Sequence, residues 1–167
     1  MIQYTKLSIT VLLSSLLVAC QSSADGKVTL RWSVDQENLG NGKVVISAVL
    51  ENNSDSTLRF LRWYTPFEAS VLGSNYTVYQ QQQNRLLELD YIGILVKRGQ
   101  PLNSDFISVF SGQKIENRQD ITNNYNFCRG LDYKIELAGF KSALDSELLL
   151  KPAALEFKAS KPFPECR

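Results

Sequence analysis

Short runs of alternating apolar and polar residues recur along most of the sequence, and this pattern restricts the folds that the chain can adopt. In residues 28–34 every second residue is apolar, namely Val28, Leu30, Trp32 and Val34, which is typical of a β-strand with one buried face. Comparable runs occupy residues 43–51, 76–79, 105–109, 115–121, 131–137 and 154–159. Turn signals separate the runs at intervals of about 8–12 residues, and no run keeps a helical period. The sequence therefore predicts an all-β fold, an immunoglobulin-like antiparallel β-sandwich of about 7–9 strands.

Residues 58–64 are expected to form the central strand of this sandwich. In a strand, Leu58 and Phe60 point to one side, while Leu61 and Trp63 point to the other. Apolar side chains on both faces favour a strand with neighbours on each side. Pro66 should end the strand near residue 64, because proline lacks the N–H donor that a sheet requires.

Four weaker patterns give local expectations. The sequence of residues 38–42 predicts the turn of a first β-hairpin. The glutamine run at residues 80–83 is expected at a turn or at the lip of a bulge, with a hydrogen-bonding patch for a partner as its alternative. Residues 86–96 are apolar almost throughout, with Gly93 as a bulge or a point of close backbone approach. Residues 147–150 are expected to form one turn of helix.

Composition limits the class of protein. A chain of 167 residues with 44% hydrophobic residues is long and apolar enough for one domain with a full core. Its formal net charge is +1, and Lys6 is the only charged residue among residues 1–19, so the remainder carries a net charge of +1 − 1 = 0. A balanced chain without a basic block has no electrostatic footprint for nucleic acid. We therefore expect no nucleic-acid partner.

Histidine is absent from the sequence. Ser-His-Asp hydrolysis, Cys-His proteolysis and the usual catalytic zinc sites all require an imidazole. We expect no catalytic residues, no metal ligands and no cofactor. Paired carboxylates for glycoside chemistry, from Glu68, Glu88 and Asp90, are the distant enzymatic alternative.

The amino-terminal segment predicts export and lipid attachment. Lys6 precedes an apolar run of about a dozen residues, which is too short to span a bilayer and is typical of a signal peptide over residues 1–19. The run ends in Leu17-Val18-Ala19-Cys20, which resembles the lipobox of bacterial lipoproteins. This resemblance implies that Cys20 is lipidated and becomes the first mature residue, and that Gln21 at the next position favours the outer membrane. The alternative is a buried cysteine beside an ordinary cleavage site.

We therefore expect a protein that its lipid holds to the outer membrane, on the periplasmic or surface face. Residues 20–26 are expected to form a short lipidated tether, which spans roughly 20 Å when fully stretched. The folded domain, residues 27–167, would then lie close to the lipid surface.

The two remaining cysteines form an even pair in an oxidising compartment. We expect a disulfide between Cys128 and Cys166 that holds the carboxyl-terminal tail against the sheet near Gly130. A reactive thiol pair is the alternative, but no Cys-x-x-Cys motif supports it. Tyr133 follows this turn and is the candidate for a tyrosine corner.

An ordered series of short motifs resembles the propeptide domain of deuterolysin-type, or aspzincin, metalloendopeptidases. In chain order the matching segments are Asn52-Asn53-Ser54, Trp63-Tyr64-Thr65-Pro66-Phe67-Glu68, Tyr91-Ile92-Gly93, Lys97-Arg98 with Pro101, Asp105-Phe106, Asp120-Ile121-Thr122 and Tyr125-Asn126-Phe127. The resemblance covers residues 44–137. Ser111 departs from the pattern, which has proline there, and neither Cys128 nor Cys166 belongs to it.

The resemblance implies a sandwich that packs against a metalloprotease, assists its folding and keeps it latent. The zinc-binding His-Glu-x-x-His helix of the peptidase is missing, so peptidase activity is not implied. We expect a non-catalytic lipoprotein that acts in trans as inhibitor or folding chaperone of an aspzincin-type metalloprotease. The alternative is a structural or pilotin-like assembly lipoprotein that binds a partner by β-augmentation. The oligomeric state stays open.

Five residues are candidates for partner binding. Trp63, Tyr64 and Phe67 are expected either to form an exposed aromatic anchor or to belong to the core. Lys97 and Arg98 are expected either to contact carboxylates at a protease cleft or to lie in a solvated turn.

Overall fold

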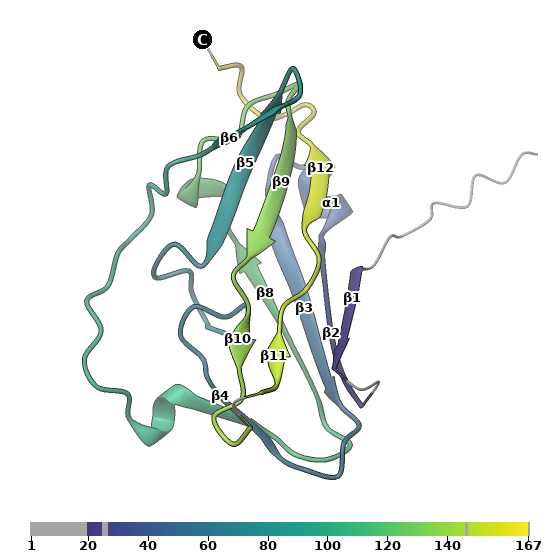
Figure 1. The fold of residues 1–167 in the computed structure, drawn as a ribbon. Helices are drawn as coiled ribbons and strands as arrows, with labels where there is room; N and C mark the ends of the chain where they lie inside the picture. The colour runs from purple at the N-terminus through teal and green to yellow at the C-terminus, as the bar shows by residue number, and fades with distance from the viewer. Residues whose placement is uncertain (1–19, 25–26, 146, 167) are drawn as a thin grey trace, which may run out of the picture.

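Two four-stranded antiparallel sheets face each other in the computed structural model, which describes residues 20–24, 27–145 and 147–166 (Figure 1). Sheet one has the order β1 (Cys20–Ala24), β2 (Val28–Val34), β3 (Val45–Asn52), β8 (Lys114–Asp120), and sheet two has the order β12 (Leu155–Lys158), β9 (Asp132–Leu137), β5 (Tyr76–Gln82), β6 (Arg85–Glu88). Two small sheets pair β4 (Leu58–Leu61) with β7 (Phe106–Val109), and β10 (Phe140–Lys141) with β11 (Leu149–Leu150). The predicted all-β sandwich is confirmed. Its strands are more numerous than expected, because several are only two to five residues long.

The core lies between the two sheets and contains the alternating apolar residues of each strand. Trp32 of β2 stacks on Tyr76 of β5, with 6.1 Å between the ring centroids. The Tyr76 hydroxyl donates a hydrogen bond to Gln119 of β8, and the Tyr125 hydroxyl donates one to the Tyr76 carbonyl oxygen. Burial raises the pKa of both tyrosines above the usual range, so both remain protonated donors.

The strand at residues 58–64 is shorter and less central than predicted. β4 ends at Leu61 and, among the described residues, pairs with β7 alone. The Thr65 hydroxyl donates to the Arg62 carbonyl oxygen (2.7 Å), which bends the chain before Pro66 is reached. The expectation of a central strand was wrong because this local turn competes with the sheet.

Other local expectations also need correction. β2 and β3 pair as predicted, but the connection between them begins with a single helical turn, α1 (Gln36–Gly40), which takes up residues 38–40 of the expected turn. Asp35 caps this helical turn by accepting the Asn38 N–H at 3.0 Å. Residues 80–82 extend β5, and the turn comes at Gln83 and Asn84, which both have positive φ. Leu149 and Leu150 form β11 rather than a turn of helix. Two short 3-10 segments, η1 (Asn103–Asp105) and η2 (Thr122–Asn124), complete the fold.

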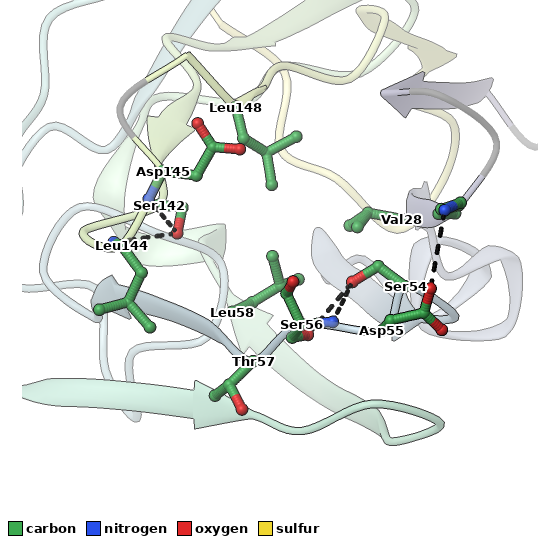
Figure 2. Close-up of a pocket in the computed structure, with 11 residues that line it drawn as sticks. Val28, Ser54, Asp55, Ser56, Thr57, Leu58, Ser142, Leu144, Asp145 and Leu148 are labelled. Carbon is green, nitrogen blue, oxygen red and sulfur yellow. Dashed lines mark hydrogen bonds and ion pairs between the residues drawn. The ribbon is translucent and has the colours of Figure 1, made fainter.

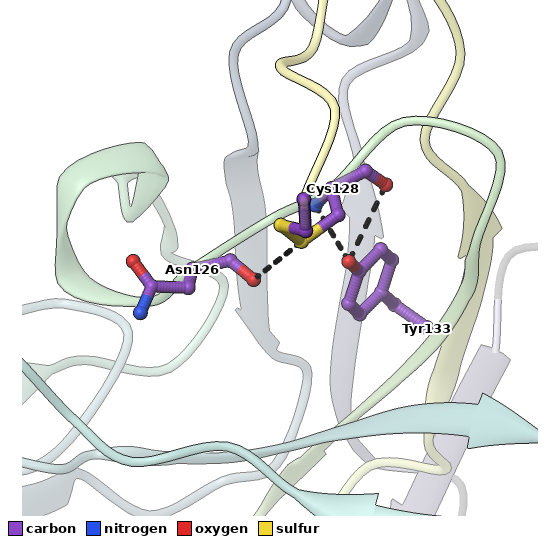
Figure 3. The surroundings of a disulfide bond; sticks show 4 residues. Asn126, Cys128 and Tyr133 are labelled. Carbon is purple, nitrogen blue, oxygen red and sulfur yellow. Dashed lines mark hydrogen bonds between the residues drawn. A yellow bond between two sulfur atoms is a disulfide. The ribbon is translucent and has the colours of Figure 1, made fainter.

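The carboxyl-terminal tail is held by a disulfide and a tyrosine corner (Figure 3). Cys128 and Cys166 are bonded, with their Cα atoms 5.4 Å apart, as the cysteine count predicted. The Tyr133 hydroxyl accepts the Cys128 N–H at 2.6 Å, which is the corner expected from sequence. Phe163 inserts into the core next to the Phe127 ring. The tail is therefore part of the sandwich.

The predictions for the amino-terminal segment can be compared with the structure only in part. Residues 1–19 and 25–26 lie outside the described residues. Residues 20–24, expected as a tether, form strand β1, which pairs with β2 so that Cys20 lies opposite Trp32. No helix among the residues that the structure describes is long and apolar enough to cross a membrane.

Candidate partner-binding loop

A loop of exposed aliphatic side chains lies between β6 and η1. The exposed fractions are 54% for Ile92, 68% for Ile94, 74% for Leu95 and 39% for Val96. We call residues 92–96 the apolar loop. In Figure 1 the chain from β6 to η1 runs down one side of the sandwich, outside both large sheets. Contiguous exposed apolar surface often marks a site of interaction with a partner, so this loop is the candidate binding element.

Tyr91 holds the first end of the apolar loop. Its hydroxyl lies 3.1 Å from the carbonyl oxygens of Val71 and Ile94, which can accept its proton, and it accepts a hydrogen bond from the Asn124 amide at 3.3 Å. The Ile92 N–H donates to the Asn124 carbonyl oxygen at 2.9 Å. The Tyr91 ring packs edge-on against Tyr125, with 5.6 Å between the ring centroids. The loop therefore begins on a fixed point of the core.

Gly93 is required by this arrangement. A Cβ atom at residue 93 would overlap both the Tyr91 ring and the Asn124 amide. The spacing Tyr-x-Gly thus has a physical reason, because the tyrosine folds back over a residue that must lack a side chain. This agrees with the close backbone approach that the sequence predicted at Gly93.

Arg98 holds the second end. Its guanidinium forms a salt bridge with Glu68, and the side chains are only 15% and 6% exposed. The guanidinium also lies 4.9 Å from the centre of the Trp63 ring and 5.7 Å from that of Tyr64. A cation over two aromatic rings and against a carboxylate is a strong contact for a side chain with little access to water.

The turn that carries Glu68 is fixed on sheet one. The Asn117 amide donates to the carbonyl oxygens of Pro66 and Glu68, both at 2.9 Å. The Gln119 amide donates to the Glu68 carbonyl oxygen at 2.8 Å. Within the turn, Oε2 of Glu68 accepts the Tyr64 N–H at 3.3 Å. Through these bonds, the position of Arg98 is determined by β8.

Tyr64 has a backbone conformation that is unusual for a bulky residue. Its φ is 59°, in the left-handed region. The ring is half-exposed and packs over Gly73, where an added Cβ would lie 2.9 Å from Cε1 of Tyr64. Strained residues of this kind are concentrated at functional sites, where surrounding contacts enforce them.

The structure brings some of the candidate residues together and separates others. Trp63, Tyr64 and Arg98 form one cluster at the second end of the apolar loop. Lys97 is exposed beside it. Phe67 is buried against Phe60, with ring centroids 5.9 Å apart, so it lies in the core, which was the alternative to an exposed anchor.

The sequence does not predict the apolar loop itself. Its pattern indicates one apolar run over residues 86–96, whereas the strand β6 (Arg85–Glu88) ends at residue 88 and the rest is loop. The available signal was the absence of alternation after residue 89, combined with Gly93 in mid-run. The role of Asn124, which is 31 residues away from Gly93 in sequence, had no local signal.

A hollow lies at the opposite end of β2 from α1. It has a volume of about 700 Å³, and Figure 2 shows Val28, Leu58 and Leu148 among the residues that line it. Oγ of Ser142 accepts the N–H groups of Leu144 and Asp145, each at 3.3 Å, so this hydroxyl shapes the loop. Among the described residues, no group of three or more acidic or cysteine side chains could hold a metal ion.

No family model matches the sequence, and no curated protein matches it.

Proposed function

We propose that the protein is a non-catalytic lipoprotein of the outer membrane that binds another protein through the apolar loop. We further propose that this partner is an aspzincin-type metalloprotease, on which the domain acts as inhibitor or folding chaperone. Cys20 is the proposed site of lipidation. The observation that carries the proposal is an exposed aliphatic loop whose two ends are held by buried polar contacts.

Three of the motifs that resemble the aspzincin propeptide support the proposal because they meet at this loop. Glu68 belongs to one motif and contacts Arg98 of another. Tyr91 and Gly93 belong to a third and contact Asn124, which lies between the last two. Residues far apart in sequence thus serve one purpose, which is to hold the apolar loop in place. Fixing a loop before binding reduces the entropy lost on association.

A titration of a purified aspzincin protease with the mature chain tests this function. We expect peptidase activity to fall with a one-to-one end point, or refolding of the denatured protease to become faster at equimolar chain. Leu95→Asp should remove the effect, whereas Phe110→Asp, which changes a residue that is 57% exposed after β7, should retain it. If the wild-type chain neither binds the protease nor changes its activity or refolding, this function is rejected.

One observation favours a second candidate, an assembly lipoprotein that binds by β-augmentation. β6 is the last strand of sheet two, its outer edge has no partner strand among the described residues, and Leu86 and Leu87 are about half-exposed. The test is co-purification of the chain with an envelope assembly. If Leu87→Asp abolishes the co-purification and Leu95→Asp does not, this candidate is favoured over the first.

A further inference from the structure

The apolar loop is fixed at its ends and by the bond from the Tyr91 hydroxyl to the Ile94 carbonyl oxygen, whereas its backbone N–H groups are open. Among the described residues, none of the backbone N–H groups of residues 93–98 has a hydrogen-bond acceptor. An open backbone between two fixed points can pair with the edge of a groove without a large loss of conformational freedom. The middle of the loop therefore has the form of a segment that enters a partner.

Leu95 is the most exposed large hydrophobic residue of the described chain, at 74%, and Ile94 is next at 68%. Binding energy is concentrated in a few central side chains that fill pockets on the partner. A loop with Leu95 at its most exposed point fits an apolar pocket of aliphatic size. The flanking Ile92 and Val96 are less exposed and suit the rim of that pocket.

Unpaired charges of opposite sign at the two ends of the loop would fix its orientation in a groove. Arg98 and Glu68 neutralise each other. Lys97, at one end of the apolar loop, and Asp90, before the other end, are exposed and form no ion pair among the residues that the structure describes. A complementary groove has a carboxylate where Lys97 lies and a cation where Asp90 lies.

The position of β1 decides which class of partner can reach the loop. β1 places Cys20 at the outer edge of sheet one, and in Figure 1 this edge and the chain between β6 and η1 lie on opposite sides of the sandwich. With Cys20 lipidated, as the proposed function requires, the bilayer lies on the β1 side. The apolar loop then faces the aqueous compartment, which favours a soluble protein over a lipid surface.

We propose that the apolar loop inserts into a groove of a soluble protein, with Leu95 in an apolar pocket and Lys97 against a carboxylate at its rim. The inference rests on the proposed function only in that the chain is lipidated at Cys20 and binds a protein. It does not require that the protein be a protease.

Position-specific cross-linking in cells tests the contact. The full lipidated chain carries a photo-reactive benzoylphenylalanine in place of Leu95 or, as control, in place of Phe110. We expect position 95 to cross-link to a soluble protein, at a site with apolar residues and a carboxylate, at least about tenfold more than position 110. Equal yields from both positions, or cross-links from position 95 to lipid, to a second copy of the chain or to nothing, would overturn the proposal.

Binding to the purified aspzincin protease separates the two proposals. We expect Leu95→Asp to weaken binding at least about 30-fold and Lys97→Glu about tenfold, with the second effect smaller at high salt. If the cross-linked protein is not a protease, the proposed partner fails and the loop contact stands. If the protease binds but neither variant weakens it, the loop contact fails and the proposed partner stands.

Vesicles of phosphatidylethanolamine and phosphatidylglycerol test the bilayer as occupant. The unlipidated Cys20→Ser chain should remain in the supernatant after sedimentation. Sedimentation with the vesicles that Leu95→Asp abolishes would overturn the inference in favour of a lipid surface.

Discussion

The salt bridge between Arg98 and Glu68 gives the sharpest prediction for stability. Replacing Arg98 with Met removes the cation and leaves the Glu68 carboxylate without its partner at 6% exposure. Leaving one charge of a buried pair uncompensated costs about 3–5 kcal/mol. The substitution also removes the contacts with the Trp63 and Tyr64 rings, each worth about 0.5–2 kcal/mol. Since domains are stable by only about 5–15 kcal/mol, Arg98→Met should lower the free energy of unfolding by a large fraction.

Urea unfolding of the oxidised chain measures this loss. Lys97→Met is the matched control, because the neighbouring cation is exposed and unpaired in the described chain, and it should change stability by less than about 0.5 kcal/mol. The double variant Arg98→Met with Glu68→Gln should recover part of the loss, since no charge is then left buried alone. If Arg98→Met and Lys97→Met unfold at the same urea concentration, Arg98 does not hold the loop.

Three further predictions concern the core and the tail. Gly93→Ala should displace the Tyr91 ring and destabilise the chain by about 1–3 kcal/mol, as measured by thermal unfolding. Gly99→Ala, where an added Cβ meets nothing within 4 Å, should leave stability unchanged. Equal effects of the two substitutions would contradict the close approach of Tyr91 to the Gly93 backbone. Burial raises the pKa of Tyr76 and Tyr125, so their contribution to stability should be constant below about pH 10. Above that pH it should fall by up to about 2.7 kcal/mol per pH unit as both tyrosines lose their protons in the unfolded state; a flat urea midpoint up to pH 11 would refute this. The double variant Cys128→Ser with Cys166→Ser removes the disulfide, which joins residues 38 positions apart, and should cost up to about 4 kcal/mol. Unchanged thermal unfolding would show that β12 and the buried Phe163 hold the tail without the disulfide.

The parts of the fold that sequence could predict are those set by local pattern. The alternation in residues 28–34 appears unchanged as the burial pattern of β2. Tyr133 could be foreseen as a corner because its hydrogen bond reaches only five residues back along the chain. In both places one short stretch contains the whole physical cause.

The parts that could not be predicted depend on contacts between distant residues. β4 has apolar side chains on both faces, yet the bond from Thr65 to Arg62 ends it early and leaves it paired with β7 alone. From sequence alone Phe67 could be an exposed anchor or a core residue, and its position against Phe60 in the folded chain decides between them. From sequence alone Arg98 is expected in a solvated turn, because its partner Glu68 is thirty residues earlier and only the fold brings the two together.

Because Tyr64 has a left-handed backbone conformation, selection for stability and selection for partner binding should favour different residues at this position. Asparagine or glycine adopts this conformation more easily than tyrosine, so a library at this position selected for thermal endurance should enrich those residues. A library selected for capture of the partner should retain the aromatic ring that rests beneath Arg98. If the two libraries enrich different residues, the strained backbone at residue 64 is retained for the contact of its ring with Arg98 and not for stability.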